Sequence, residues 1–350
     1  MNRFFAPLFL FCASFWLAPL AASAITISTV PVGNLGNGND PSDGDSNIAG
    51  IQNFGGVADA YNIGTTEVTN AQYADFLNAK AASDPLALYN GGMNSDPRGG
   101  ISRSGVSGSF TYAVKTDMGN KPVIYVSWYD SIRFANWLNN GQGTGDTETG
   151  AYSLLGGTPT PSNGDLITRT PGATWFLPTE NEWYKAAYHQ PAAQGGDADN
   201  YWLYPTASNS EPTHATANSV GDISNPGANV ANYDLAAFRD GNVTTVASAG
   251  PLSRSFYGTY DQGGNVFEWN ESRIINEAGV QRGLRGGSWF ELSYALISSD
   301  RRTANQVVGS DQIGFRVATV PEPSAIVLAA MAGLCGLAMV ARKRYRVASR

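Results

Sequence analysis

Residues 260–269 read Tyr-Asp-Gln-Gly-Gly-Asn-Val-Phe-Glu-Trp, and residues 285–289 read Arg-Gly-Gly-Ser-Trp. Each segment joins a pair of glycines, which permit tight turns and close backbone approach, to apolar and aromatic residues that favour strands. Residues 314–318, Gly-Phe-Arg-Val-Ala, have the same character. The sequence therefore predicts short strands at 265–270, 283–289 and 314–318.

Three helices are predicted upstream of these strands, each preceded by a hydroxyl residue that can cap it. Thr69 precedes the first, and Ser127 precedes an amphipathic helix over 128–138. The third follows Thr179, where Glu182 stands three residues later and completes a capping-box pattern. These signals are local, so they fix where each helix begins.

The remaining sequence predicts short strands and long irregular loops. Residues 60–68 and 122–126 are expected to be strands, and some seventy residues after His189 show no periodicity. A few helices together with short strands and long loops are typical of an α+β domain. The expected fold class is α+β, with few helices and many irregular loops.

Composition limits the kinds of function. The chain has 350 residues, a net charge of −7 and no basic stripe in its body, which argues against a nucleic-acid partner. Its two cysteines are Cys12 and Cys335, one near each end. The region between them therefore has no disulfide, no thiolate metal site and no cysteine nucleophile.

The N-terminal residues have the pattern of a secretory signal peptide. Arg3 is followed by an apolar run to Leu20, and the small residues 22–24 suit signal peptidase, which predicts a signal over 1–24. A retained membrane anchor is the alternative. Residues 25–56 could be a linker or an edge strand, and 57–319 are expected to form one domain.

The C-terminal residues 320–346 combine three features in order. Pro321, Glu322 and Pro323 precede an uncharged stretch over 325–341, and a basic cluster ends the segment. As a helix, the uncharged stretch would reach roughly 26 Å, enough for a thin bilayer. A buried core helix is the alternative.

This tail resembles the PEP-CTERM sorting signal of Gram-negative bacteria. The resemblance implies processing by an exosortase-type membrane protease and a membrane association before that processing. It also implies delivery to the cell envelope, the cell surface or the extracellular matrix.

Five segments of the body occur in an order that resembles the sulfatase-modifying-factor family, whose founder is the formylglycine-generating enzyme. Any one segment is weakly specific, but five in order are a strong match. The resemblance implies the C-type-lectin-like fold of that family, with a small twisted antiparallel sheet. The segments are 64–73, 122–130, 177–183, 258–269, and 285–289 with 314–318.

The resemblance also implies two structural calcium sites, whose oxygen ligands suit this hard cation. The alternative is that the aspartates are turn residues and that Glu268 is a paired carboxylate. The first site would use Asn232, Tyr233, Asp240 and Asn242. The second would use Asp261, Gly264, Val266 and Glu268.

The family's copper chemistry does not transfer to this sequence. The founder holds copper with two cysteines that follow its Gly-Gly-Ser-aromatic strand, and the matching positions here are Glu291 and Leu296. A carboxylate and an aliphatic side chain cannot replace soft thiolates, so no copper is expected. His189 and His214 lack metal-binding spacing, and His189 is interpreted as a partner of a helix dipole.

Three further groups of residues have a structural interpretation as well as a functional one. Glu180 and Glu182 are explained by helix capping and the helix dipole. Arg301, near Asp300 and Arg302, is expected to brace a buried carboxylate, although an anionic ligand is the alternative. Aromatic residues could line a pocket or simply be core. The aromatic residues are Trp289, Phe290, Tyr294, Tyr201 and Trp202.

The expected function is that of an exported, non-catalytic module that binds carbohydrate, peptide or a neighbouring envelope protein. One alternative is an oxidoreductase or protein-modifying enzyme of the formylglycine-generating type that uses a site without cysteine. Another is a purely structural matrix component.

Overall fold

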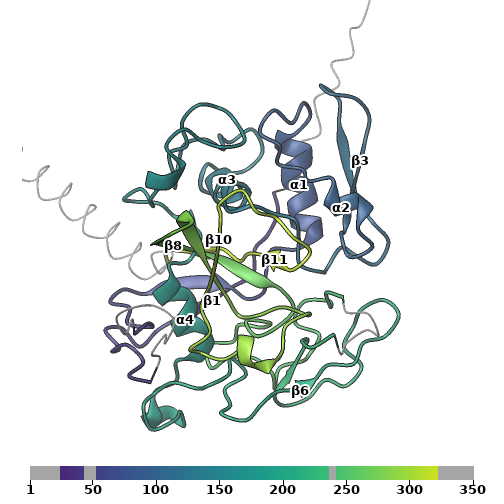
Figure 1. Cartoon of the computed structure of the whole chain (residues 1–350). Helices are drawn as coiled ribbons and strands as arrows, with labels where there is room; N and C mark the ends of the chain where they lie inside the picture. Colours follow the sequence, from purple (N-terminus) through teal and green to yellow (C-terminus); the bar gives the residue numbers. More distant parts are fainter. Residues whose placement is uncertain (1–23, 43–52, 236–241, 322–350) are drawn as a thin grey trace, which may run out of the picture.

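The computed structural model describes residues 24–42, 53–235 and 242–321 (Figure 1). The predicted signal peptide up to residue 23, the apolar tail helix over 325–341 and residues Asp240, Glu322 and Pro323 lie outside these ranges. Within the described ranges, no helix has the length and apolarity needed to cross a bilayer.

Each of the three longer helices begins with a capping box, as the sequence predicts. In α1 the side chain of Thr69 accepts from the backbone of Gln72, and Ser127 and Thr179 act in the same way in α3 and α4. The helices are α1 (Asn70–Lys80), α2 (Gly92–Ser95), α3 (Trp128–Asn139) and α4 (Glu180–Tyr188). Short 3-10 turns cover Gly164–Leu166, Ala192–Gln194 and Ser293–Ala295.

Two four-stranded sheets form the centre of the molecule. The first joins the two ends of the domain in the order β1-β2-β12-β5, entirely antiparallel. Its strands are β1 (Thr29–Val32), β2 (Tyr61–Gly64), β5 (Trp175–Phe176) and β12 (Ala318–Thr319). Residues 29–32 thus form an edge strand of this sheet.

The second sheet has the order β10-β9-β8-β11, with only β11 parallel to its neighbour. Its strands are β8 (Phe267–Asn276), β9 (Gly279–Arg285), β10 (Arg302–Ala304) and β11 (Ile313–Gly314). Two small pairs complete the fold: β3 (Ile101–Ser104) with β4 (Thr111–Val114), and β6 (Thr213–His214) with β7 (Val230–Ala231).

The predicted strand over 122–126 is wrong. Only an isolated bridge between Thr69 and Pro122 forms there, and Tyr125 adopts a left-handed backbone with φ 63°. The predicted strands over 265–270 and 283–289 form one hairpin, β8–β9, which extends further than expected toward its turn. The glycine pairs at 263–264 and 286–287 flank the hairpin at the end opposite its turn, but they do not indicate how long its strands are.

Helix α3 is the centre of the core and is buried along almost its whole length, rather than on one face. The ring of Phe134 packs edge-on against Phe76 of α1 and against Phe315, with centroids 5.4 Å apart in both pairs. The Trp128 indole donates to the carbonyl of Asn270 in β8 at 3.0 Å. Figure 1 shows the β8–β9 hairpin running between α3 and α4.

Candidate functional site

The inner end of β8 carries a fully buried ion pair. Both oxygens of Glu268 accept from the Arg316 guanidinium at 2.6 Å, and the Trp183 indole donates to the same carboxylate at 2.7 Å. Arg316 also donates to the carbonyls of Gly64 and Tyr260. Glu268, Arg316 and Trp183 are each 0% exposed, so this pair ties α4 and β2 to the centre of the second sheet.

Two further carboxyl groups lie near this pair. Burial, reinforced by nearby Asp261, raises the pKa of Glu67 well above its ordinary value, and burial raises the pKa of Asp261 to about 6. The Asn265 amide donates to one oxygen of Glu67 at 2.9 Å, while the other oxygen is buried and has no hydrogen-bond partner in the described ranges. With Glu268, three carboxyls face one guanidinium, so protons or a cation must balance the excess negative charge.

The second predicted calcium site is brought together only in part. Asp261 interacts electrostatically with Glu268, and Asp261 accepts the backbone N–H of Ala247 at 2.6 Å. Both oxygens of Glu268, however, are engaged by Arg316 and Trp183. A calcium ion on Glu268 would have to share it with a guanidinium, so in this arrangement Glu268 fits an ion-pair partner better than a metal ligand.

The first predicted calcium site fits a cation where the structure describes it. The side-chain oxygen of Asn232 is buried and accepts no hydrogen bond from the described residues, while its amide nitrogen donates to the Asn242 carbonyl at 2.8 Å. An unpartnered buried amide oxygen is costly unless something electropositive contacts it. Tyr233 follows directly and is buried, and Asp240 lies outside the described residues. The calcium prediction remains a prediction.

The positions of the family's copper cysteines hold no suitable ligand. Leu296 is 0% exposed and belongs to the main apolar core. Glu291 is half-buried, and its backbone carbonyl accepts a hydrogen bond from the backbone N–H of Asp234. Neither side chain offers the soft sulfur that copper(I) prefers. The residues present therefore do not fit copper.

The interpretation of Glu180 as a capping residue is incomplete. Its carboxylate is 3% exposed and contacts Arg301 at 2.7 Å and Arg285 at 2.8 Å, with a hydrogen bond from Ser272 at 2.6 Å. Burial alone would raise the pKa of Glu180, but the two arginines lower it. The expected brace of Arg301 on a buried carboxylate is confirmed, and Glu182 acts as the capping residue.

His189 stands at the C-terminal end of α4, as expected, but it is not a cationic partner of the helix dipole. Burial, assisted by nearby Lys185, lowers the pKa of His189 to about 4, so its imidazole is neutral. Its Nδ1 lies 2.8 Å from the hydroxyl of Tyr257, whose ring stacks on it. His214 is exposed and lies 3.6 Å from Asp234.

The predicted aromatic pocket does not form as one surface. Trp289 and Tyr201 are buried in two different core clusters, whereas Phe290 and Tyr294 are about half exposed. Tyr201 lines a separate cavity together with His189 and residues 34–39. Within the described ranges, no group of three histidine, cysteine or carboxylate side chains is placed to hold a metal.

Sequence reasoning missed a cavity at the start of α3. Asp130 and three tyrosines line it, and Tyr125 is the residue with the left-handed backbone. Asp130 stands at the third position of the helix, where a carboxylate is fully explained by capping. No sequence signal separates a capping aspartate from one that also faces a cavity.

Comparison with known proteins identifies the family to which the chain belongs. The description "Sulfatase-modifying factor enzyme 1-like domain" matches residues 19–320, most of the chain. The chain belongs to this family. The match confirms the resemblance of the body, and the α+β fold with few helices and small sheets is as expected for it.

Two solved structures share the fold. "Treponema denticola variable protein 1" is 22% identical, with a TM-score of 0.55, and the alignment covers 86% of this chain and 97% of that one. A structure titled "Crystal Structure of CarF" is 23% identical, with a TM-score of 0.54, covering 85% and 99%. No curated protein matches. Identities this low establish the fold alone.

Proposed function

We propose that this family member is an exported, non-catalytic module that binds a ligand at the cell surface or in the extracellular matrix. The observation that carries the proposal is the pair Glu291 and Leu296 at the positions of the copper cysteines. Leu296 is core, so a metal could not reach it without unpacking the domain. The scaffold of the family is kept, and its catalytic ligands are not.

Calcium is proposed as a structural brace of the loop that follows β7. The unpartnered oxygen of Asn232 supports a cation there, with the Tyr233 and Asn242 carbonyls and Asp240 as the further ligands implied by the family. The buried excess of negative charge around Asp261 supports a second cation nearby. Calcium accepts such mixed carboxylate, amide and carbonyl ligands.

Export is proposed from the two ends of the chain. The signal pattern over 1–24 and the tail over 320–346 support secretion followed by processing near Pro321. The proposed processing partner is an exosortase-type protease in the envelope of a Gram-negative bacterium. The net charge of −7 of the whole chain argues against a nucleic-acid partner.

The test combines a ligand screen with an activity assay on the purified full chain. A glycan and peptide array should give reproducible binding, while a cysteine-containing sulfatase peptide incubated with copper and oxygen should remain unmodified by mass spectrometry. Conversion of that cysteine to formylglycine would establish the enzyme alternative. An array without any hit would instead favour a purely structural component.

A further inference from the structure

A cavity of about 240 Å³ opens between the start of α3 and the loops that precede α2 and β11. Tyr89, Tyr125 and Tyr129 contribute to its wall together with Asp130. None of its lining residues is a lysine or arginine, so Asp130 is the charged group among them. The residues implied in copper or calcium binding lie elsewhere.

The Asp130 carboxylate is only half used by the helix cap. Its Oδ2 accepts from the backbone N–H of Ser127 at 2.9 Å and from the Ser127 hydroxyl at 2.6 Å. Within the described part of the chain, its Oδ1 accepts no hydrogen bond. Asp130 is 8% exposed, so this oxygen belongs to a buried carboxylate that lines the cavity.

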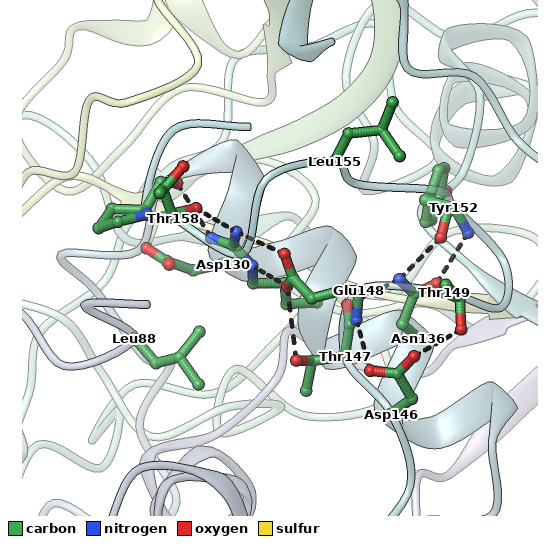
Figure 2. Close-up of polar contacts among 12 residues, drawn as sticks. Leu88, Asp130, Asn136, Asp146, Thr147, Glu148, Thr149, Tyr152, Leu155 and Thr158 are labelled. Carbon is green, nitrogen blue, oxygen red and sulfur yellow. Dashed lines mark hydrogen bonds and ion pairs between the residues drawn. The ribbon is translucent and has the colours of Figure 1, made fainter. Parts of the chain in front are cut away.

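The neighbouring cation is already neutralised. Arg133 donates to both oxygens of Glu148, at 2.6 and 3.1 Å, and to the carbonyls of Thr158 and Pro159. Figure 2 shows Asp130 beside these contacts, which hold the loop from Asp146 to Thr158. The charge of Asp130 therefore lacks a dedicated partner in the fold.

The electrostatic surroundings agree with that geometry. Burial raises the pKa of Asp130 to about 6, although Ser127 and Arg133 oppose the rise and Asp84 adds to it. At neutral pH the group is still ionised, but its charge is costly in this position. A bound cation would offset that cost.

Tyr125 is held in a strained and defined position. Its φ of 63° lies in the left-handed region, which is rare for an aromatic residue and points to a functional constraint. Its hydroxyl donates to Asp96 at 2.6 Å, and a Cβ on Gly92 would meet the ring at 2.6 Å. The Tyr89 hydroxyl is likewise bound, to the Ile101 carbonyl. Both tyrosines therefore offer the cavity ring carbons, not free hydroxyls.

The rest of the wall has an apolar part and a polar part, the latter made by Asn90, Ser127 and Thr160. Leu86, Ala87, Pro159 and Val307 line the cavity, and Val307 is 53% exposed. Such a wall suits an alkyl stem, while tyrosine rings and a carboxylate suit the ammonium group at its end. The polar side chains offer hydrogen bonds to the hydroxyls of an amino sugar, which is therefore the competing ligand in the test.

We propose that this cavity receives a lysine side chain of a peptide or protein ligand, with its ammonium group on Asp130 and its alkyl stem against the tyrosine rings. The inference rests on the proposed ligand-binding function and names the chemistry that the site recognises. Asp130 is then both a member of the capping box of α3 and the specificity-determining residue of the site.

The test titrates the full chain with Nα-acetyl-lysine methylamide and follows binding by NMR. A ligand this small should bind with a dissociation constant in the roughly millimolar range. Nα-acetyl-norleucine methylamide, which has the apolar stem without the charge, should bind at least about tenfold more weakly. Glucosamine tests whether an amino sugar is the better ligand.

Two variants locate the binding. Asp130→Asn keeps an acceptor for the Ser127 cap and should weaken lysine binding about tenfold. Val307→Phe narrows the exposed mouth without changing the core and should do the same, even if the first variant folds poorly. Asp146→Asn, a change in the adjacent loop and outside the cavity wall, is the matched control and should bind as the parent does.

Two results would overturn the inference. One is that the lysine compound does not bind at tens of millimolar, whether or not glucosamine binds in a way that depends on Asp130. The other is that the norleucine compound binds as tightly as the lysine compound. Neither of them would remove hits that the array gives for other ligands. Failure here is therefore distinct from failure of the proposed binding function.

Discussion

Glu268 at the centre of β8 and Asp130 in the first turn of α3 are both buried carboxylates, but their surroundings differ. Glu268 has a guanidinium on both oxygens and an indole on one, all fully buried. Asp130 has its bonds on one oxygen and a cavity beside it. The first arrangement uses its charge to hold the scaffold, whereas the second leaves charge available for a ligand.

The largest expected effect comes from breaking the paired region. Glu268→Gln removes the carboxylate that is hydrogen-bonded to Arg316 and leaves this buried charge only the electrostatic attraction of Glu67 and Asp261. The free energy of unfolding should fall by about 3–5 kcal/mol. Urea denaturation measures the change. Asp300→Asn, which weakens the more exposed contact to Arg302, is the control and should cost less than about 1 kcal/mol. Equal losses of stability in the two variants would contradict the view that the buried pair of Glu268 holds the scaffold more strongly than the more exposed pair of Asp300.

Removal of calcium should have the next largest effect. If calcium braces the loop at Asn232, a concentration one hundred times the dissociation constant stabilises the fold by about 2.7 kcal/mol, and a chelator removes that gain. Thermal denaturation with calcium, with magnesium and with chelator measures it. Identical melting temperatures in all three conditions would remove calcium from the account.

The pH dependence gives a smaller effect with a defined sign. The pKa of His189 is lowered from 6.5 to about 4, so the unfolded chain takes up this proton first as the pH falls. Stability is therefore lost between about pH 6.5 and 4, and His189→Gln should lose less over that window.

Carboxyls with raised pKa values, such as Asp130, act in the opposite direction, but they are present in both chains and cancel in the comparison. The measurement is urea denaturation at several pH values. Parallel pH profiles for parent and variant would show that His189 is not the neutral buried group described.

The smallest effect on stability is expected at Asp130. Asparagine can still accept from Ser127, and removal of a costly buried charge offsets part of any loss. Asp130→Asn should therefore change the free energy of unfolding by less than about 1 kcal/mol at pH 7. A loss as large as that of Glu268→Gln would mean that Asp130 is purely structural.

Local features of the fold could be predicted, and distant pairings could not. The caps at Thr69, Ser127 and Thr179 were correct because a cap depends on residues three apart. Glu268 and Arg316 lie 48 residues apart, and Glu180 and Arg301 lie 121 apart. Only the folded chain brings such charges together, so their pairing was missed or left open.

The candidate site was predicted from the family more than from physics. The order of the motifs identified the family, and the resemblance implies that Glu291 and Leu296 stand at the positions of its cysteines. The Asp130 cavity could not be predicted from the sequence. No signal there indicates the left-handed backbone of Tyr125, which interrupts the predicted strand over 122–126. The capping role explains an aspartate at position 130 and gives no sign that its second oxygen faces a cavity.

The metal content of the purified protein tests the central claim most directly. The full chain with Cys12→Ser and Cys335→Ser, so that no thiol contributes, would be exposed to calcium and copper(I), dialysed, and measured by mass spectrometry of the metals. The account predicts calcium in stoichiometric amount and no retained copper. Stoichiometric copper that survives dialysis would contradict a scaffold without the family's catalytic centre.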